Sequence, residues 1–179
     1  MTRLLPIAAL LMLMPMLAAA HEYRAGTLLI EHPWARATPK GAEVGGGYMK
    51  VVNEGKQADR LIGASLALAQ KTEIHAMKME NGVMQMRPAT QGLEIKPGAT
   101  LEFNPESFHL MFEGLRQPLT QGQHVEGTLV FEKAGTVKVV FFVEGIGAHS
   151  PQGAASGSKS GVMSHMEGMP ASKAAEQAR

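Results

Sequence analysis

The chain has 179 residues, and its 17 basic and 16 acidic side chains give a formal net charge of +1, so neither nucleic acid nor an anionic membrane is an expected partner. It contains 13 methionines and seven histidines but no cysteine, which excludes disulfides and the cysteine thiolate of a blue-copper electron carrier. The length suits one domain with a tail.

The first twenty residues have the pattern of a secretory signal peptide. Arg3 gives a positive start, residues 4–17 form an apolar run interrupted by two prolines, and three alanines at 18–20 provide a cleavage site. The run is shorter than the roughly 20 residues that a bilayer-spanning helix needs, and no second apolar stretch follows it. We therefore expect a periplasmic protein whose mature chain is not inserted in the membrane.

Short apolar alternations separated by turn residues predict an all-β domain over residues 21–146. The predicted strands cover residues 26–33, 47–53, 60–65, 72–77, 82–88, 100–103, 109–112, 125–131 and 136–143. A helical turn around residues 65–70 would be too short to shape the fold. The turn residues recur at intervals typical of a Greek-key β-sandwich or barrel.

The two predicted strands nearest the C-terminus give the clearest pattern. Alternate positions over residues 125–131 are valine, glycine, leucine and phenylalanine, and residues 137–143 alternate in the same way. The segment from Glu132 to Gly135 supplies a turn between them. These residues predict a hairpin with one face in the core.

Imidazole and thioether groups are the only soft metal donors in the chain, and they gather in three short segments. These are His75-Ala-Met77-Lys-Met79, Met84-Gln-Met86 and, after 22 intervening residues, His109-Leu-Met111. Such donors prefer copper, above all Cu(I), over zinc, calcium or magnesium. Thioethers also bind without losing a proton and cannot be lost to disulfides outside the cytoplasm.

Residues two apart in a strand project from the same face, so each of these segments presents its donors together. If the strands that carry His75, Met86 and His109 are neighbours, a site of two histidines and two methionines follows. The alternative is packing, because methionine often fills gaps in cores. The methionines of residues 77–86 share a register that could equally be the buried face of a hairpin turning at Asn81-Gly82.

Two further groups of donors lie near the ends of the mature chain. From residue 147 the composition becomes rich in Gly, Ala, Ser, Gln and Lys, which predicts a disordered tail over 147–179. Within it, Met163-Ser-His165-Met166-Glu-Gly-Met169, with His149 upstream, is a candidate for a second, weaker or Cu(II)-capable site. The alternative is a low-complexity tail whose methionines bind no metal. Cleavage after Ala20 would give His21 a free α-amine beside its imidazole, a bidentate pair for Cu(II). We expect His32 and His124 to be structural or solvent-facing.

The donor spacing resembles the signature of the PCu(A)C-type periplasmic copper chaperones, which is a histidine, ten residues, a methionine, about twenty-one residues and then His-x-Met. Here ten residues separate His75 from Met86, and 22 separate Met86 from His109-Leu-Met111. The resemblance spans roughly residues 29–143. It includes His32-Pro-Trp-Ala-Arg36, Gly47-Tyr-Met49, Leu61-Ile-Gly63, Gly82-Val-Met-Gln-Met-Arg87, Phe108-His-Leu-Met111 and Leu129-Val-Phe-Glu132.

The resemblance implies a cupredoxin-like β-sandwich in which His75, Met86, His109 and Met111 bind Cu(I). It also implies delivery of copper to the CuA centre in subunit II of cytochrome c oxidase, alongside a Sco-type thioredoxin-like chaperone. No Ser/His/Asp pattern or phosphate-binding glycine loop points to an enzyme. The alternative function is a periplasmic copper buffer or resistance protein without a dedicated client.

Overall fold

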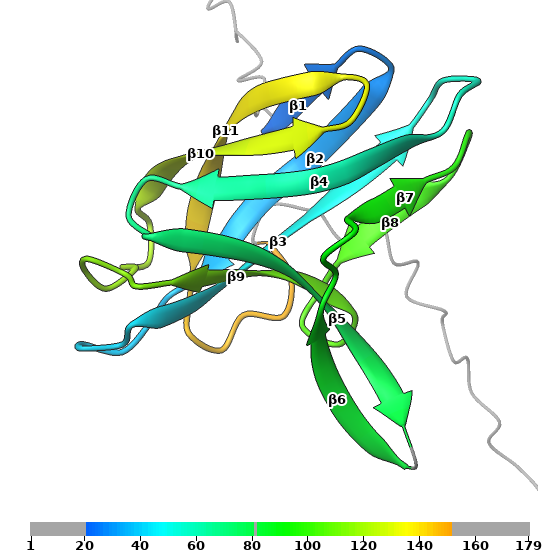
Figure 1. The fold of residues 1–179 in the computed structure, drawn as a ribbon. Helices are drawn as coiled ribbons and strands as arrows, with labels where there is room; N and C mark the ends of the chain where they lie inside the picture. Colours follow the sequence, from blue (N-terminus) through cyan, green and yellow to red (C-terminus); the bar gives the residue numbers. More distant parts are fainter. Residues whose placement is uncertain (1–20, 81, 152–179) are drawn as a thin grey trace, which may run out of the picture.

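The computed structural model describes residues 21–80 and 82–151, and these residues form strands and turns without a helix (Figure 1). The all-β prediction is confirmed, and each predicted strand overlaps an observed one. The strands are β1 (Glu22–Ala25), β2 (Leu28–Arg36), β3 (Val44–Asn53), β4 (Asp59–Leu66), β5 (Lys71–Glu80), β6 (Val83–Pro88), β7 (Leu93–Ile95), β8 (Thr100–Phe103), β9 (Phe108–Glu113), β10 (His124–Phe131) and β11 (Gly135–Glu144). Only the short β1 and β7 were not predicted.

The strands form one curled, hydrogen-bonded sheet. Its order is β6-β5-β9-β8-β3-β2-β11-β10-β4-β7, with β1 added beside β2 and a further pairing between β9 and β3. Strands β4 and β5, which lie near opposite ends of this path, also contact each other, so the sheet folds back over its own inner face. The result is the layered, sandwich-like arrangement visible in Figure 1, with a single hydrophobic core between the layers.

Aromatic side chains join the two halves of this core. Phe112 of β9 and Phe141 of β11 are both fully buried, and their rings meet edge to face with centroids 5.5 Å apart. Glycine is required at position 127, because a Cβ atom there would lie 2.7 Å from the Phe141 ring. Strand β9 is therefore anchored to the core through its inward-facing side chains.

The predicted hairpin near the C-terminus is confirmed as β10 and β11. The strands pair antiparallel, with Phe131 opposite Gly135, and Gly135 has the positive φ of 78° that favours glycine. Buried residues alternate with more exposed ones along β10. The apolar side chains that point inward are Val125, Leu129, Phe131, Val139, Phe141 and Val143.

Strands β5 and β6 form a hairpin that projects from the body of the domain (Figure 1). Three of its methionines are largely exposed, Met79 at 60%, Met84 at 49% and Met86 at 46%. The alternative interpretation, in which these side chains form the buried face of a hairpin, is therefore wrong. The hairpin lies at the end of the sheet, where β6 is an edge strand that pairs only with β5 among the described residues.

Asp59 ties the start of β4 to the β10–β11 turn. Its buried carboxylate accepts hydrogen bonds from the backbone N–H groups of Arg60, Lys133 and Ala134, at 2.7–2.9 Å. Burial alone would raise the pKa of Asp59, but these backbone donors outweigh that effect and hold the pKa below its usual value. The resulting stabilisation is present above the unfolded pKa of about 3.9 and is lost as the pH falls through the folded pKa.

We expect Asp59→Asn to lower the free energy of unfolding at pH 7 by about 2 kcal/mol, because an amide loses the charge and turns an N–H group toward a backbone donor. The deficit should shrink as the pH falls below about 4, where the wild-type carboxylate becomes protonated. Urea unfolding at pH 7 and pH 3 measures both effects. The exposed Glu132→Gln variant is the control, and equal deficits at the two pH values would contradict the assignment.

None of the residues that the structure describes belongs to a helix with the length and apolar character needed to cross a membrane. The ordered contacts reach a little beyond residue 146, because the Arg36 guanidinium donates two hydrogen bonds to the Ala148 carbonyl, at 2.6 and 3.1 Å. The predicted signal peptide and most of the predicted tail lie outside the described residues.

Candidate metal centre

The two histidines of the predicted site lie directly opposite each other on neighbouring strands. Strands β5 and β9 pair antiparallel with His75 opposite His109, and the ring centroids are 5.6 Å apart. Both residues are buried, at 8% and 7% exposed. Their neighbours Ile74 and Leu110 point the other way, into the hydrophobic core, so the histidines occupy the outer face of this part of the sheet.

Each of these histidines has a buried ring nitrogen without a partner. The Nδ1 atoms of His75 and His109 are both inaccessible to solvent and make no hydrogen bond. Leaving a buried polar group unsatisfied costs about 1–3 kcal/mol, so two such atoms in adjacent side chains need an explanation. Imidazole nitrogens with free lone pairs are common metal ligands, which makes this pair a candidate metal centre.

Electrostatics favour the neutral form of His109. Burial lowers the pKa of His109, and repulsion from His75 lowers it further, against the opposing effect of a hydrogen bond with the Ser107 backbone. The ring is therefore uncharged at neutral pH and keeps a lone pair for a metal ion.

The strand register brings the two methionines of the predicted site to the same face. Met111 follows His109 by two residues in β9. Met86 of β6 lies opposite Met77, which follows His75 by two residues in β5. Because opposed residues share a face and residues two apart share it too, the backbone places all four predicted ligands on one face of β6, β5 and β9.

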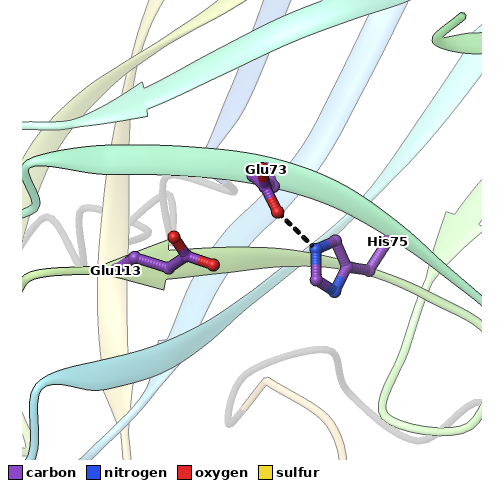
Figure 2. Close-up of side chains that lie close together, drawn as sticks. All are labelled: Glu73, His75 and Glu113. Atoms are coloured by element: carbon purple, nitrogen blue, oxygen red, sulfur yellow. Dashed lines mark hydrogen bonds and ion pairs between the residues drawn. The ribbon is translucent and has the colours of Figure 1, made fainter. Parts of the chain in front are cut away.

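A carboxylate orients His75. Nε2 of His75 lies 2.8 Å from Oε2 of Glu73, two residues earlier in β5 (Figure 2). A carboxylate accepts the Nε2 proton, which fixes the tautomer and leaves the unpaired Nδ1 as the atom available to a metal ion. Hydrogen bonds from Lys71 and then from His75 hold the pKa of Glu73 below its usual value, so this carboxyl stays ionised.

Glu113 of β9 completes an acidic edge beside the site. Potential ligand atoms of Glu73, His75 and Glu113 all lie within 4.8 Å of one another (Figure 2). Lys71 forms ion pairs with both carboxylates, so its positive charge offsets part of the negative charge at this edge. Neither glutamate was predicted from the sequence as part of the site. The spacing Glu73-x-His75 was a usable signal, because it places a carboxylate on the same strand face as the histidine.

We expect Glu73→Gln to weaken copper binding about 10- to 100-fold, the usual cost of losing a partner that orients a metal-ligating histidine. Glutamine keeps the size of the side chain but removes the charge that fixes the His75 tautomer. Competition with a Cu(I) chelator gives the dissociation constant. Glu113→Gln is the matched control, since its carboxylate makes no hydrogen bond to His75 among those that the structure describes. An equal loss in both variants would argue against an orienting role.

The other predicted donors are dispersed. Met77 and Met84 lie on the same face as the site, with Met84 further out along the hairpin. His21 is exposed, and its ring lies 6.1 Å from that of His124 and 6.5 Å from that of Phe142. Strands β10 and β11 are not neighbours of β5 or β9, so His21 does not join the site on this face. His149 is exposed beyond β11, and Met163, His165, Met166 and Met169 lie outside the described residues.

The two remaining histidines fit the expectation that they are structural or solvent-facing. His124 is exposed at the start of β10. His32 is partly buried and has a φ of 46°, at the point where the pairing of β2 with β3 shifts register. Its backbone N–H donates a hydrogen bond to the His21 carbonyl at 3.0 Å.

A family model described as "Putative lipoprotein LpqE-like" matches residues 28–143, which include the whole β5–β6–β9 region. The chain belongs to the LpqE-like family. A protein of Leifsonia xyli subsp. xyli (strain CTCB07) described as a putative lipoprotein is 29% identical to this chain over 126 residues. That alignment covers 70% of this chain and 75% of the relative.

Solved structures of copper-binding domains share the fold of this LpqE-like protein. The copper-bound PCuAC domain from PmoF2 is 32% identical with a TM-score of 0.59, and the match covers 70% of this chain and 98% of that one. Cu(I)-bound DR1885 from Deinococcus radiodurans is 26% identical with a TM-score of 0.52, over 71% of this chain and 83% of that one. The expected cupredoxin-like fold is therefore confirmed.

Proposed function

We propose that this LpqE-like protein is an extracytoplasmic copper chaperone that binds Cu(I) through His75, Met86, His109 and Met111. The observation that carries the proposal is the buried, cross-strand pair of histidines whose Nδ1 atoms have no partner. The copper-bound PCuAC domain from PmoF2 and Cu(I)-bound DR1885, which share the fold, support the choice of metal. The lipoprotein descriptions of the family and of its relative support a location outside the cytoplasm.

The donor set favours Cu(I) over Cu(II). Two imidazole nitrogens and two thioether sulfurs carry no charge, and soft sulfur ligands select the monovalent ion. The ionised Glu73 is not one of the four proposed ligands. It contacts Nε2 of His75, and a carboxylate in that position makes the imidazole a stronger ligand. A Cu(II)-capable site formed by His21, His149 and the tail donors would be separate from this centre.

The site is closed on one side and open on the other, which suits transfer. The two histidines are buried, whereas Met86 lies on the edge strand β6 and is 46% exposed. An incoming acceptor with thiolate ligands could replace the thioether first, before the imidazoles release the ion. We propose the CuA centre in subunit II of cytochrome c oxidase as the destination, with a Sco-type chaperone acting in the same assembly step.

Anaerobic Cu(I) titration with X-ray absorption at the copper edge tests the metal centre. The wild type should show a mixed nitrogen and sulfur shell, and the His109→Ala/Met111→Ala variant should lose it. His124→Ala, which removes an exposed histidine from a different part of the sheet, is the matched control and should retain the shell. Truncation after residue 151 keeps the Arg36–Ala148 contact but removes Met163, His165, Met166 and Met169, so it should weaken Cu(II) uptake and leave the Cu(I) shell unchanged. Binding that disappears with the tail instead would contradict the proposed ligands.

Deletion of the gene tests delivery. A chaperone mutant should lack CuA-containing oxidase at low copper, and the wild-type gene should restore it while the His109→Ala/Met111→Ala gene should not. A strain that keeps its oxidase but becomes sensitive to high copper would overturn delivery in favour of a copper buffer.

A further inference from the structure

Four methionines of the β5–β6 hairpin form two directly opposed pairs. Met77 lies opposite Met86, and Met79 lies opposite Met84 one step nearer the turn. Because opposed residues and residues two apart share a strand face, the two pairs lie one above the other on the face that carries His75. We call these four residues the methionine ladder. Its inner pair includes the proposed ligand Met86, and its outer pair has no role in the proposed site.

The ladder does not contribute to the hydrophobic core. Met79, Met84 and Met86 are each about half exposed, and none of the four belongs to the buried cluster. Exposed apolar side chains that lie next to one another usually mark a binding surface, because leaving apolar groups in contact with water is unfavourable. The other face of the hairpin is mostly polar, with Lys78, Glu80, Gln85 and Arg87 beside the exposed Val83. Glu80 forms ion pairs there with Lys78 and Arg87.

The geometry of an opposed pair suits a soft ion. Side chains directly opposite each other in an antiparallel pair have Cβ atoms about 4.5–5.5 Å apart. Methionine has three rotatable side-chain bonds, so two sulfurs can turn toward a single ion between them. Successive pairs are two residues apart along the strand, or about 7 Å. An ion held by one pair is thus within reach of the sulfurs of the next.

We propose that Met79 and Met84 form a second Cu(I) site and that the methionine ladder carries Cu(I) between solvent and the buried histidines. This inference rests on the proposed function and deepens it, because it assigns the route by which the same site is filled and emptied. In each step a bond from Cu(I) to a sulfur of one pair breaks as a bond to a sulfur of the next pair forms. No proton or electron moves, because thioethers are neutral in both states.

Silver(I) is a suitable probe because it prefers the same soft donors and does not change oxidation state under these conditions. The full-length protein is labelled with ¹³C at its methionine methyl groups and titrated with Ag(I), and the signals are assigned by single Met→Leu variants. The first equivalent should shift the Met86 and Met111 methyls. Further Ag(I) should shift the Met79 and Met84 methyls.

Transfer kinetics test the route itself. The Met79→Leu/Met84→Leu variant keeps the apolar bulk of the outer pair but removes its sulfurs. Its Cu(I) dissociation constant at the histidine site should equal that of the wild type. Transfer of Cu(I) to a thiolate chelator should be about tenfold slower, because a neighbouring pair presents its sulfurs at a far higher effective concentration than solvent does. Val83→Ala, an exposed change on the other face of the same hairpin, should transfer at the wild-type rate.

The outcomes separate the two proposals. Shifts at Met86 and Met111 with unmoved Met79 and Met84 signals would overturn the ladder and leave the proposed function standing. Wild-type transfer rates in the double variant would overturn the route as well. Failure of Ag(I) to shift Met86 and Met111 at any concentration would overturn the proposed function, and the route would fall with it.

Discussion

His75→Ala is expected to weaken Cu(I) binding by more than about 100-fold. Loss of a residue that only orients a ligand can cost roughly 100-fold, and this substitution removes a proposed ligand itself. His75 is buried opposite His109, and its unpaired Nδ1 has no other role among the described contacts. Chelator competition under anaerobic conditions measures the change. Cu(I) should also raise the melting temperature of the wild type and leave that of the variant unchanged.

The control for this prediction is His124→Ala, which removes an exposed imidazole that lies on β10. Its affinity for Cu(I) should match that of the wild type. If His75→Ala retained an affinity within about tenfold of the wild type, a difference of only 1.4 kcal/mol, the histidine pair would not be the metal centre.

The second large effect concerns the support of the site. We expect Phe112→Ala to lower the free energy of unfolding by about 3–5 kcal/mol, as truncation of a fully buried aromatic residue usually does. Phe112 packs against Phe141 from the opposite half of the core, and the next residue toward the N-terminus, Met111, lies on the face of the candidate metal centre. The variant therefore loosens β9 without removing a ligand.

Urea unfolding of the copper-free protein measures this loss. Free Cu(I) at about 100 times its dissociation constant should restore roughly 2.7 kcal/mol, provided that the unfolded chain does not bind it. Val44→Ala, on a side chain that is 47% exposed, should change stability by less than about 0.5 kcal/mol. A variant as stable as the wild type would show that the Phe112–Phe141 contact does not hold β9 in place.

The sequence determined the class of fold and supplied the candidate metal-binding groups. Alternating apolar residues specify strands because side chains in an extended chain project to opposite faces, and the β10–β11 hairpin followed this pattern closely. Absence of cysteine, together with histidines and methionines two residues apart, limited the metal chemistry to soft, neutral donors. Strands of three or four residues, such as β7 and β1, are too short to give a recognisable alternation.

Only the tertiary structure decided which donors meet and which face water. His75 and His109 are 34 residues apart, and their direct opposition follows from the long-range pairing of β5 with β9. An alternating pattern also cannot show whether a methionine face is covered. Three of the four ladder methionines are exposed because the β5–β6 hairpin projects beyond the body of the domain, whereas the equally regular inner faces of β10 and β11 are buried in the core. Local sequence sets the spacing of side chains, but burial and register depend on the strands that fold against them.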